Sequence, residues 1–246
     1  AVGATDSALW ERATAARAPR FAVPGGLAPR ASLWSLVAPL LVVGDRLGVL
    51  HAPADVLEQA ADLLYALTER YRVDRDAFVN PAKTLATELA GAWPVVWGST
   101  PLAGVAAYRF ACQLAENAKI LAVYGELPEA AHNQVVGLDA GRTPPDNGAD
   151  ASASDQVTRL VLLRDVEEHP AVARRATVVR EMAEERGVAV SEASAEGASA
   201  LERIASLIAL ADFASVYLAF LRGVDPTPVT AIDTLKARIR LAPDAR

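Results

Sequence analysis

The chain has 246 residues, of which 52% are hydrophobic and 22% are charged, and its formal net charge at pH 7 is −6. This length allows one large α/β domain or two small ones, and the acidic balance argues against nucleic acid or an anionic membrane as a partner. Cys112 is the single cysteine, which excludes a disulfide framework and favours a reducing, cytoplasmic location. With three scattered histidines, no residue spacing resembles a zinc site.

The N-terminal segment combines strand patterns with a short helix. AVGA resembles the end of a buried strand, and the following DSALWERATAAR predicts an amphipathic helix with Asp6 or Ser7 as its N-cap. FAVPGG (21–26) predicts a short strand with a turn. Because a protein seldom begins in the middle of an α/β unit, we expect residues 1–28 to be the remnant of an upstream subdomain.

Residues 29–92 are expected to form a helical connecting region. A buried helix containing SLWSLVAPLLV comes first, and residues 53–71 repeat apolar positions at helical spacing. Asn80 and Pro81 predict the start of another helix, and Gly91 predicts its end.

From residue 93 onward, strands and helices alternate. WPVVWGS (93–99) predicts a buried strand that passes directly into a helix over 101–119, as at the start of a doubly wound unit. Further strands are predicted over 120–126, 156–165 and 188–194, a helical turn over 127–134, and helices over 169–187, 197–222 and 229–240. This alternation predicts a helix-rich α/β protein, a three-layer αβα sandwich with a mainly parallel sheet.

Three segments have a composition that needs explanation. The segment 138–155 is dense in Gly, Pro, Asp, Ala and Ser without periodicity, and predicts a flexible linker. The apolar stretches 31–50 and 197–223 resemble membrane segments, but charged residues interrupt both of them. We therefore interpret both as buried helices of a soluble protein without a membrane partner.

Glu116 and His132 are the first candidates for chemistry. Glu116 lies near the end of the helix predicted over 101–119, and a carboxylate there is a candidate general base. On spacing alone, an exposed glutamate paired with Lys119 is the simpler interpretation. His132 is suited to moving protons near neutral pH, although a structural histidine is the more common case.

Two further features are candidates for binding. Ser99 and Thr100 follow a strand and open a helix, so their amides and hydroxyls are candidates for binding an anion of the substrate. The segment lacks the glycine spacing of the nucleotide-binding fingerprints, and a plain strand–helix turn is the favoured interpretation. Arg30 lies between a proline and a helix start, where a cation is unexpected, and a functional role is therefore considered.

Five segments, in chain order, together resemble a known family. They are PRASLWSL (29–36), NPAKTLA (80–86), ENAK (116–119), LPEAAHNQVVG (127–137) and DPTPVTAIDTLK (225–236). The chain resembles the bifunctional phosphoglucose/phosphomannose isomerases of the sugar isomerase (SIS) superfamily. ENAK and LPEAAHN are the specific part, with Glu116 and His132 sixteen positions apart. The resemblance covers nearly the whole chain from about residue 20 and leaves the predicted linker unmatched.

The resemblance implies an aldose–ketose isomerase that converts glucose 6-phosphate or mannose 6-phosphate to fructose 6-phosphate through a cis-enediol. Glu116 would move the proton between C1 and C2, and Arg30 would stabilise the enediolate charge. His132, supplied by the partner subunit of a homodimer, and Lys236 would assist ring opening. Thr227 would line the C2 side of the sugar, and no metal or cofactor is implied.

The chain departs from this family in one respect. Its members build the sugar-phosphate site from loops of a first SIS subdomain, with a Gly-Gly-Ser turn and a Ser-x-Ser-x-x-Thr segment, and neither pattern occurs here. We expect residues 93–246 to be the second SIS subdomain. Three interpretations follow: the C-terminal part of an isomerase, a catalytically silent SIS-type protein that binds a sugar phosphate or dimerises for regulation, or a structural scaffold that retains the motifs.

Overall fold

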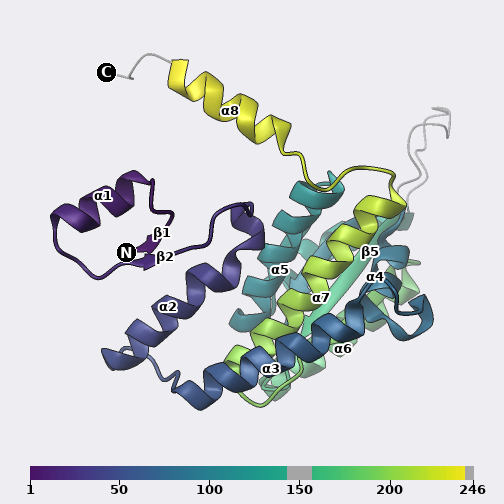
Figure 1. The fold of residues 1–246 in the computed structure, drawn as a ribbon. Coiled ribbons are helices and arrows are strands. Elements are labelled where there is room, and N and C mark those ends of the chain that lie inside the picture. The colour runs from purple at the N-terminus through teal and green to yellow at the C-terminus, as the bar shows by residue number, and fades with distance from the viewer. Residues whose placement is uncertain (143–156, 242–246) are drawn as a thin grey trace. The chain divides into compact units, whose positions relative to one another are not determined.

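The computed structural model describes residues 1–142 and 157–241, and Figure 1 shows their helices and strands. The chain divides into two compact units, Ala1–Asp62 and Leu63–Arg246. The division falls within helix α3 (Ala54–Tyr71). The domain boundaries predicted after residues 28 and 92 stay a prediction.

The first unit begins with a small parallel sheet. Strand β1 (Val2–Gly3) pairs with β2 (Phe21–Ala22), and helix α1 (Ala8–Ala15) connects them. Ser7 is the N-cap of α1, and its hydroxyl accepts a hydrogen bond from the backbone N–H of Trp10. Both residues of β1 are half-buried rather than buried, so the predicted strand exists but its predicted burial is wrong.

Helix α2 (Leu33–Arg46) also corrects the prediction of a buried helix. None of its residues is buried, and Leu40 is 57% exposed. Within its own unit the helix has few partners, because two strands of two residues each and the short α1 offer little apolar surface. Asp45 fixes the end of the helix by accepting a hydrogen bond from the backbone N–H of Ala52 at 2.9 Å.

The second unit is built on a four-stranded parallel sheet with the spatial order β4-β3-β5-β6. The strands are β3 (Ala92–Gly98), β4 (Val123–Glu126), β5 (Val157–Arg164) and β6 (Ala189–Ser194). In this sheet Val95 lies opposite Val123 of β4 and Leu160 of β5. β4, β5 and β6 lie within the segments predicted from the sequence, and β3 begins one residue before its predicted segment 93–99.

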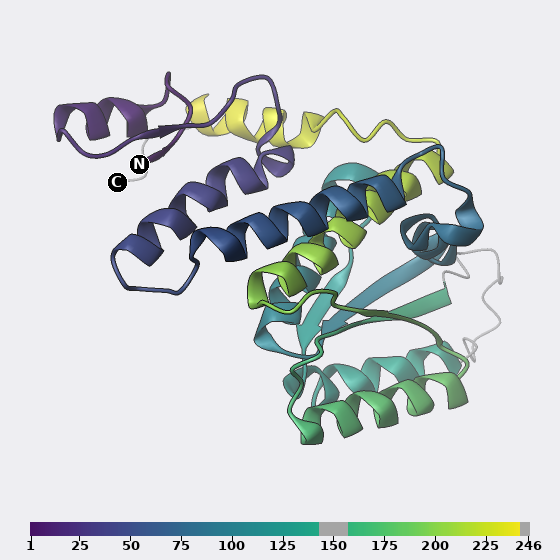
Figure 2. The same ribbon diagram turned by 60° about the horizontal axis from the view of Figure 1, so that its bottom comes forward.

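Helices cover both faces of this sheet, as Figure 2 shows. One face carries α4 (Pro81–Leu89), α5 (Pro101–Gln113) and α7 (Ala200–Leu221), and both α4 and α5 pack on α7. The other face carries α6 (Pro170–Glu185) and 3₁₀ turns that follow β4. The parallel sheet between helical layers confirms the predicted α/β architecture.

Two helices of this layer have well-formed caps, and the sequence predicts those of α4. Asn80 accepts hydrogen bonds from the backbone of Ala82 and Lys83 at the start of α4. Gly91, just after α4, has a φ of 78°, a left-handed conformation that glycine adopts without strain. At α7, Ser199 and Glu202 form a reciprocal capping box.

Helix α7 is the longest apolar element of the second unit. By length and composition it would be able to span a membrane, but 61% of its most apolar 18-residue window is buried inside the protein. This burial is typical of a core helix and agrees with the prediction over 197–222. The last helix, α8 (Thr230–Leu241), also matches its prediction and has no buried residue.

Two predictions for the second unit need correction. The helix predicted over 101–119 is α-helical only to Gln113, and its last residues, Leu114–Ala118, form a π-helical turn. A π turn changes the helical period only slightly, so hydrophobic periodicity does not reveal it.

The predicted linker begins too early. Residues Gln134–Arg142 form a 3₁₀ segment, and Leu138 is 2% exposed in the core that contains Trp97. Asp139 binds the Arg186 guanidinium at 2.6 Å. These long-range contacts hold the segment to the sheet and α6, which local composition does not predict. Residues 143–155 of the predicted linker lie outside the described residues.

Candidate active site

A row of polar contacts fixes the C-terminal half of α5 against α7. Arg109 donates to both carboxylate oxygens of Asp212, at 3.0 and 2.7 Å, and Gln113 donates to the same carboxylate at 2.9 Å. Asn117, in the next turn, donates to the Ser215 hydroxyl at 2.9 Å. Residues 109, 113 and 117 are four apart and share one face, so the row continues from the helix into the π turn.

Glu116 lies on this π-helical turn. The backbone N–H of Lys119 closes the turn by donating to the carbonyl of Leu114. Asn117 is thereby buried against α7, at 5% exposure, while the neighbouring Glu116 is half-buried. Turns of this kind inside helices often occur at functional sites, because they redirect a side chain without ending the helix.

Lys119 joins this turn to the loop before α8. Its ammonium group donates to the carbonyl oxygen of Glu116, to that of Pro228 at 2.7 Å and to that of Pro226 at 3.4 Å. The simplest interpretation of the sequence pairs Lys119 with the Glu116 side chain and misses these backbone contacts. A lysine near a helix C-terminus often binds the last carbonyls of its own helix, so the sequence indicates the contact with Glu116 but not those with the two prolines.

A pocket of about 230 Å³ lies between the π turn and the start of α8. Its lining residues are Ala115, Glu116, Lys119, Pro228, Val229, Thr230, Ala231 and Ile232. Thr227 directly precedes this lining, and its backbone N–H donates to Asp225 at 2.8 Å. Lys236 is exposed and lies about one helical turn beyond Ile232 on α8. The fold therefore brings Glu116 and Lys119 against residues 228–232, which lie between Thr227 and Lys236 in the chain.

His132 lies elsewhere in the second unit. It follows the 3₁₀ turn Glu129–Ala131 after β4, is exposed, and lines a separate pocket of about 240 Å³ with Arg175. Helix α5 leaves the carboxyl end of β3 and returns to the amino edge of the sheet, so Glu116 lies at the amino edge. His132 follows the carboxyl end of β4, at the opposite edge. One chain does not bring these two side chains together.

Arg30 belongs to the first unit. It is half-buried on the 3₁₀ turn Pro29–Ala31 that precedes α2. Its predicted role beside Glu116 stays a prediction.

Ser99 and Thr100 hold the carboxyl edge of β3 to that of β5. The Thr100 hydroxyl caps α5 and lies 3.1 Å from the carboxylate of Asp165, and the buried Ser99 hydroxyl accepts the backbone N–H of Asp165 at 2.9 Å. Arg203, also buried, pairs with Asp165 at 2.8 Å. These contacts give both hydroxyls a structural role, and their predicted role in substrate binding stays a prediction.

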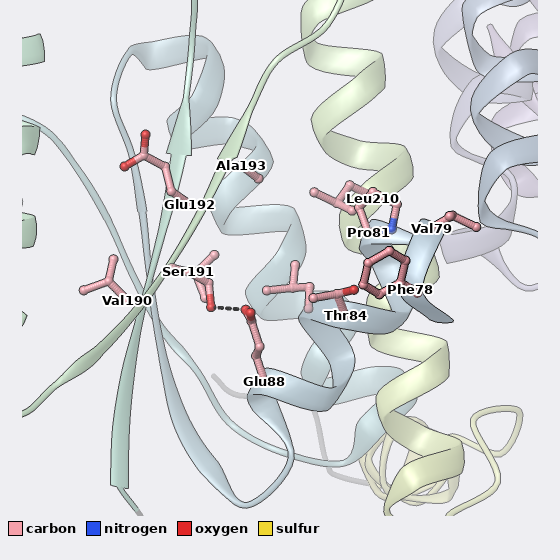
Figure 3. Close-up of a pocket in the computed structure, with 12 residues that line it drawn as sticks. Phe78, Val79, Pro81, Thr84, Glu88, Val190, Ser191, Glu192, Ala193 and Leu210 are labelled. Atoms are coloured by element: carbon pink, nitrogen blue, oxygen red, sulfur yellow. Dashed lines mark hydrogen bonds between the residues drawn. The ribbon is translucent and has the colours of Figure 1, made fainter. Parts of the chain in front are cut away.

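A pocket of about 420 Å³ lies at β6, away from the predicted residues (Figure 3). It extends from the exposed Phe78 to Ser191, whose hydroxyl donates to Glu88 at 2.5 Å. Arg159 donates to the same Ser191 oxygen at 3.0 Å. The polar groups here bind one another, so the pocket's volume alone does not make it the preferred site.

Metal ligands do not gather in the described part of the chain. Within residues 1–142 and 157–241, no group of three or more His, Cys, Asp or Glu side chains is placed to hold a metal ion.

Comparisons with known proteins identify relatives that match most of the chain. The chain is 32% identical over 217 residues to a bifunctional phosphoglucose/phosphomannose isomerase from Caldicellulosiruptor bescii, covering 88% of this chain and 61% of the relative. It is 31% identical over 232 residues to the protein of the same name from Aquifex aeolicus, covering 94% of this chain and 65% of the relative. The chain thus spans less than two thirds of the length of these curated relatives.

A solved structure shows the same fold. The glucose-6-phosphate isomerase-like protein from Thermus thermophilus superposes with a TM-score of 0.65 at 22% identity, covering 93% of this chain and 74% of that one. The family model described as the bacterial phospho-glucose isomerase C-terminal SIS domain matches residues 78–239, which contain α4 to β6, α7 and most of α8. The chain therefore belongs to the family of bacterial phospho-glucose isomerase C-terminal SIS domains.

Proposed function

We propose that this chain carries the proton-transfer residues of an isomerase that converts glucose 6-phosphate or mannose 6-phosphate to fructose 6-phosphate. The observation that carries the proposal is the 230 Å³ pocket. It brings the turn of Glu116 against the loop that follows Thr227, although these segments are more than a hundred residues apart in the chain. The names of the two curated relatives support the same reaction class.

In this proposal, Glu116 transfers the proton between C1 and C2 through a cis-enediol intermediate. Lys236 and His132 assist ring opening, Arg30 stabilises the enediolate, and Thr227 lines the C2 side of the sugar. Each step moves a proton or stabilises charge, so the proposed chemistry uses amino-acid side chains without a metal or cofactor. Ser99 and Thr100 are left out, because a phosphate there would meet the Asp165 carboxylate.

An exposed apolar patch supports the proposal of a homodimer. It covers the outer face of α5 and the edge strand β4, and it consists of Val105, Tyr108, Leu121, Val123 and Tyr124, which are 43–72% exposed. The rings of Tyr108 and Tyr124 lie 4.9 Å apart and join the two elements. A large exposed apolar patch is typical of an interaction surface.

The position of this patch supports a second copy of the chain as its occupant. Glu116 follows α5 at the amino edge of the sheet, and His132 follows the carboxyl end of β4, so the two residues flank the elements that carry the patch. A two-fold axis through the patch exchanges the two ends, so it brings the partner's His132 toward Glu116. The separation of the two residues within one chain is therefore what a shared site requires.

The carboxyl edge of the sheet favours the alternative of a catalytically silent sugar-phosphate-binding or regulatory protein. Doubly wound folds bind ligands at this edge, but here Asp165, Glu168 and Arg203 fill it with ion pairs. An edge filled by ion pairs favours the form of this alternative in which the chain dimerises for regulation without turnover. The cytoplasmic location predicted from the single cysteine stays a prediction in both cases.

An isomerase assay decides between the two functions. The purified protein is expected to convert fructose 6-phosphate to glucose 6-phosphate or mannose 6-phosphate. Glu116→Gln should lower turnover by about 10²-fold or more, because the amide cannot accept the proton, while far-UV circular dichroism stays unchanged. Glu185→Gln, at an exposed position of α6, serves as the control. A protein inert to all three hexose phosphates, or an active Glu116→Gln variant, would contradict the proposal.

A further inference from the structure

Lys119 makes a set of contacts that the proposed chemistry does not use. Its ammonium group has three N–H donors, and the carbonyl oxygens of Glu116, Pro226 and Pro228 supply three acceptors. The proline carbonyls belong to residues 107 and 109 positions further along the chain. We call Lys119 and these three carbonyl groups the Lys119 clamp.

The backbone at this position makes the lysine unusual. Lys119 has a φ of 58°, in the left-handed region where glycine is the common residue after a helix. A second cation binds the same helix end, since Arg222 donates to the carbonyl of Ala118 at 3.0 Å. Two cations at the C-terminus of one helix also interact favourably with its dipole. The side chain of Lys119 thus provides contacts that a glycine would lack.

The clamp spans the candidate pocket. Glu116 and Lys119 line one wall, and Pro228 and Ile232 line the other. The two proline carbonyls that Lys119 binds lie on either side of Thr227 in the chain, so the clamp holds this residue from both sides. The start of α8 follows four residues after Pro226.

We propose that Lys119 is a positioning residue that fixes the Thr227 loop at a set distance from Glu116. Through this contact it determines the width of the pocket and the entry of the chain into α8, which carries Lys236. The catalytic consequence rests on the proposed function, whereas the clamp itself does not.

Amide hydrogen exchange tests the clamp without any activity measurement. Lys119→Met removes the ammonium group at similar length and should speed exchange of the Thr227 and Ile232 amides by about tenfold, the loss expected for charge-assisted hydrogen bonds. Lys119→Arg should keep part of the protection. Lys83→Met is the matched control, because Lys83 donates to the carbonyls of Val73 and Arg75 at 2.7 and 2.6 Å. It should leave the Thr227 loop unchanged.

A glycine variant is the control for the case in which Lys119→Met does not fold. Lys119→Gly relieves the left-handed backbone while removing the clamp, so it should fold and still show the faster exchange. Unchanged exchange in both Lys119→Met and Lys119→Gly would overturn the proposal, whether or not the protein is active.

Kinetics test the positioning role. Lys119→Met should lower kcat by about tenfold, because misplacing the groups around the substrate costs rate, and Lys119→Arg should restore part of it, while Lys83→Met leaves kcat unchanged. An active enzyme whose loop loosens at unchanged kcat would overturn the role of Lys119 in positioning. A wild-type protein inert to hexose phosphates would contradict the proposed function. Hydrogen exchange would then still show whether Lys119 holds the Thr227 loop.

Discussion

Glu168 shows how single residues hold the carboxyl edge of the sheet. Its side chain is 6% exposed and pairs with Arg164 at 2.5 Å. Burial acts to raise the pKa of Glu168, but hydrogen bonds with Arg164 and Ser99 and the charge of Arg164 outweigh it, so the pKa lies below its ordinary value of 4.5. The Ser99 hydroxyl therefore takes part in stabilising an ionised carboxylate.

This shift predicts a pH dependence of stability. Because the pKa of Glu168 is lowered on folding, its stabilisation is fully present above the unfolded-state value and disappears as pH falls through the folded-state value. Glu168→Gln should lower the free energy of unfolding by about 1–3 kcal/mol at neutral pH, and the difference from wild type should shrink in acid. Urea unfolding at several pH values measures it.

Glu184→Gln is the control for this prediction. Glu184 also pairs with an arginine four residues away, Arg180, but its side chain is 52% exposed. An equal loss in both variants, or a loss at Glu168 that does not vary with pH, would contradict the assignment.

At the scale of elements, the contact between α5 and α7 positions the turn of Glu116. Burial raises the pKa of Asp212, and the paired Arg109 and Gln113 oppose that shift. The half-buried carboxylate therefore depends on its partners to stay ionised.

Removing the cation should destabilise this contact. Arg109→Met is expected to lower the free energy of unfolding by about 2 kcal/mol at neutral pH, because it leaves a half-buried carboxylate without its cation. The loss should be smaller in acid, where Asp212 is protonated. Adding Asp212→Asn should recover part of it. Arg180→Met, which breaks the exposed pair with Glu184, should cost less than about 1 kcal/mol in the same urea titration.

At the scale of the whole molecule, the proposed dimer makes each site from two chains. Glu116 and His132 lie at opposite edges of the sheet, so each proposed site takes Glu116 from one chain and His132 from the other. A site therefore loses one of its two residues when either chain carries the corresponding substitution. Mixing inactive proteins then becomes informative.

Mixed Glu116→Gln and His132→Ala chains should regain activity. With random exchange, half of the dimers are mixed and each has one intact site, so about one quarter of wild-type turnover is expected. Tyr108→Asp, in the apolar patch, should reduce both dimerisation and this recovery, as followed by light scattering and the isomerase assay. No recovery from freely exchanging dimers would contradict a site shared between subunits.

Local patterns account for much of the second unit. Short apolar segments predict its strands. Asn80 and Gly91 predict the two ends of α4, and the long apolar run of α7 predicts that this helix is buried. These features depend on neighbouring residues alone. The order of the five sequence motifs also indicates the family to which the chain belongs. The first unit is less predictable, since the exposure of α2 depends on which partners the fold supplies.

The residue types of the candidate site, its parallel sheet and its family follow from the sequence, since spacing and capping are local properties of the chain. The pocket between Glu116 and the Thr227 loop does not follow from it, because a contact across a hundred residues depends on how α5 and α7 pack. The same holds for the π turn, for Lys119 binding proline carbonyls and for the separation of His132 from Glu116. Tertiary packing determines which polar groups meet, and therefore which of them are available for chemistry.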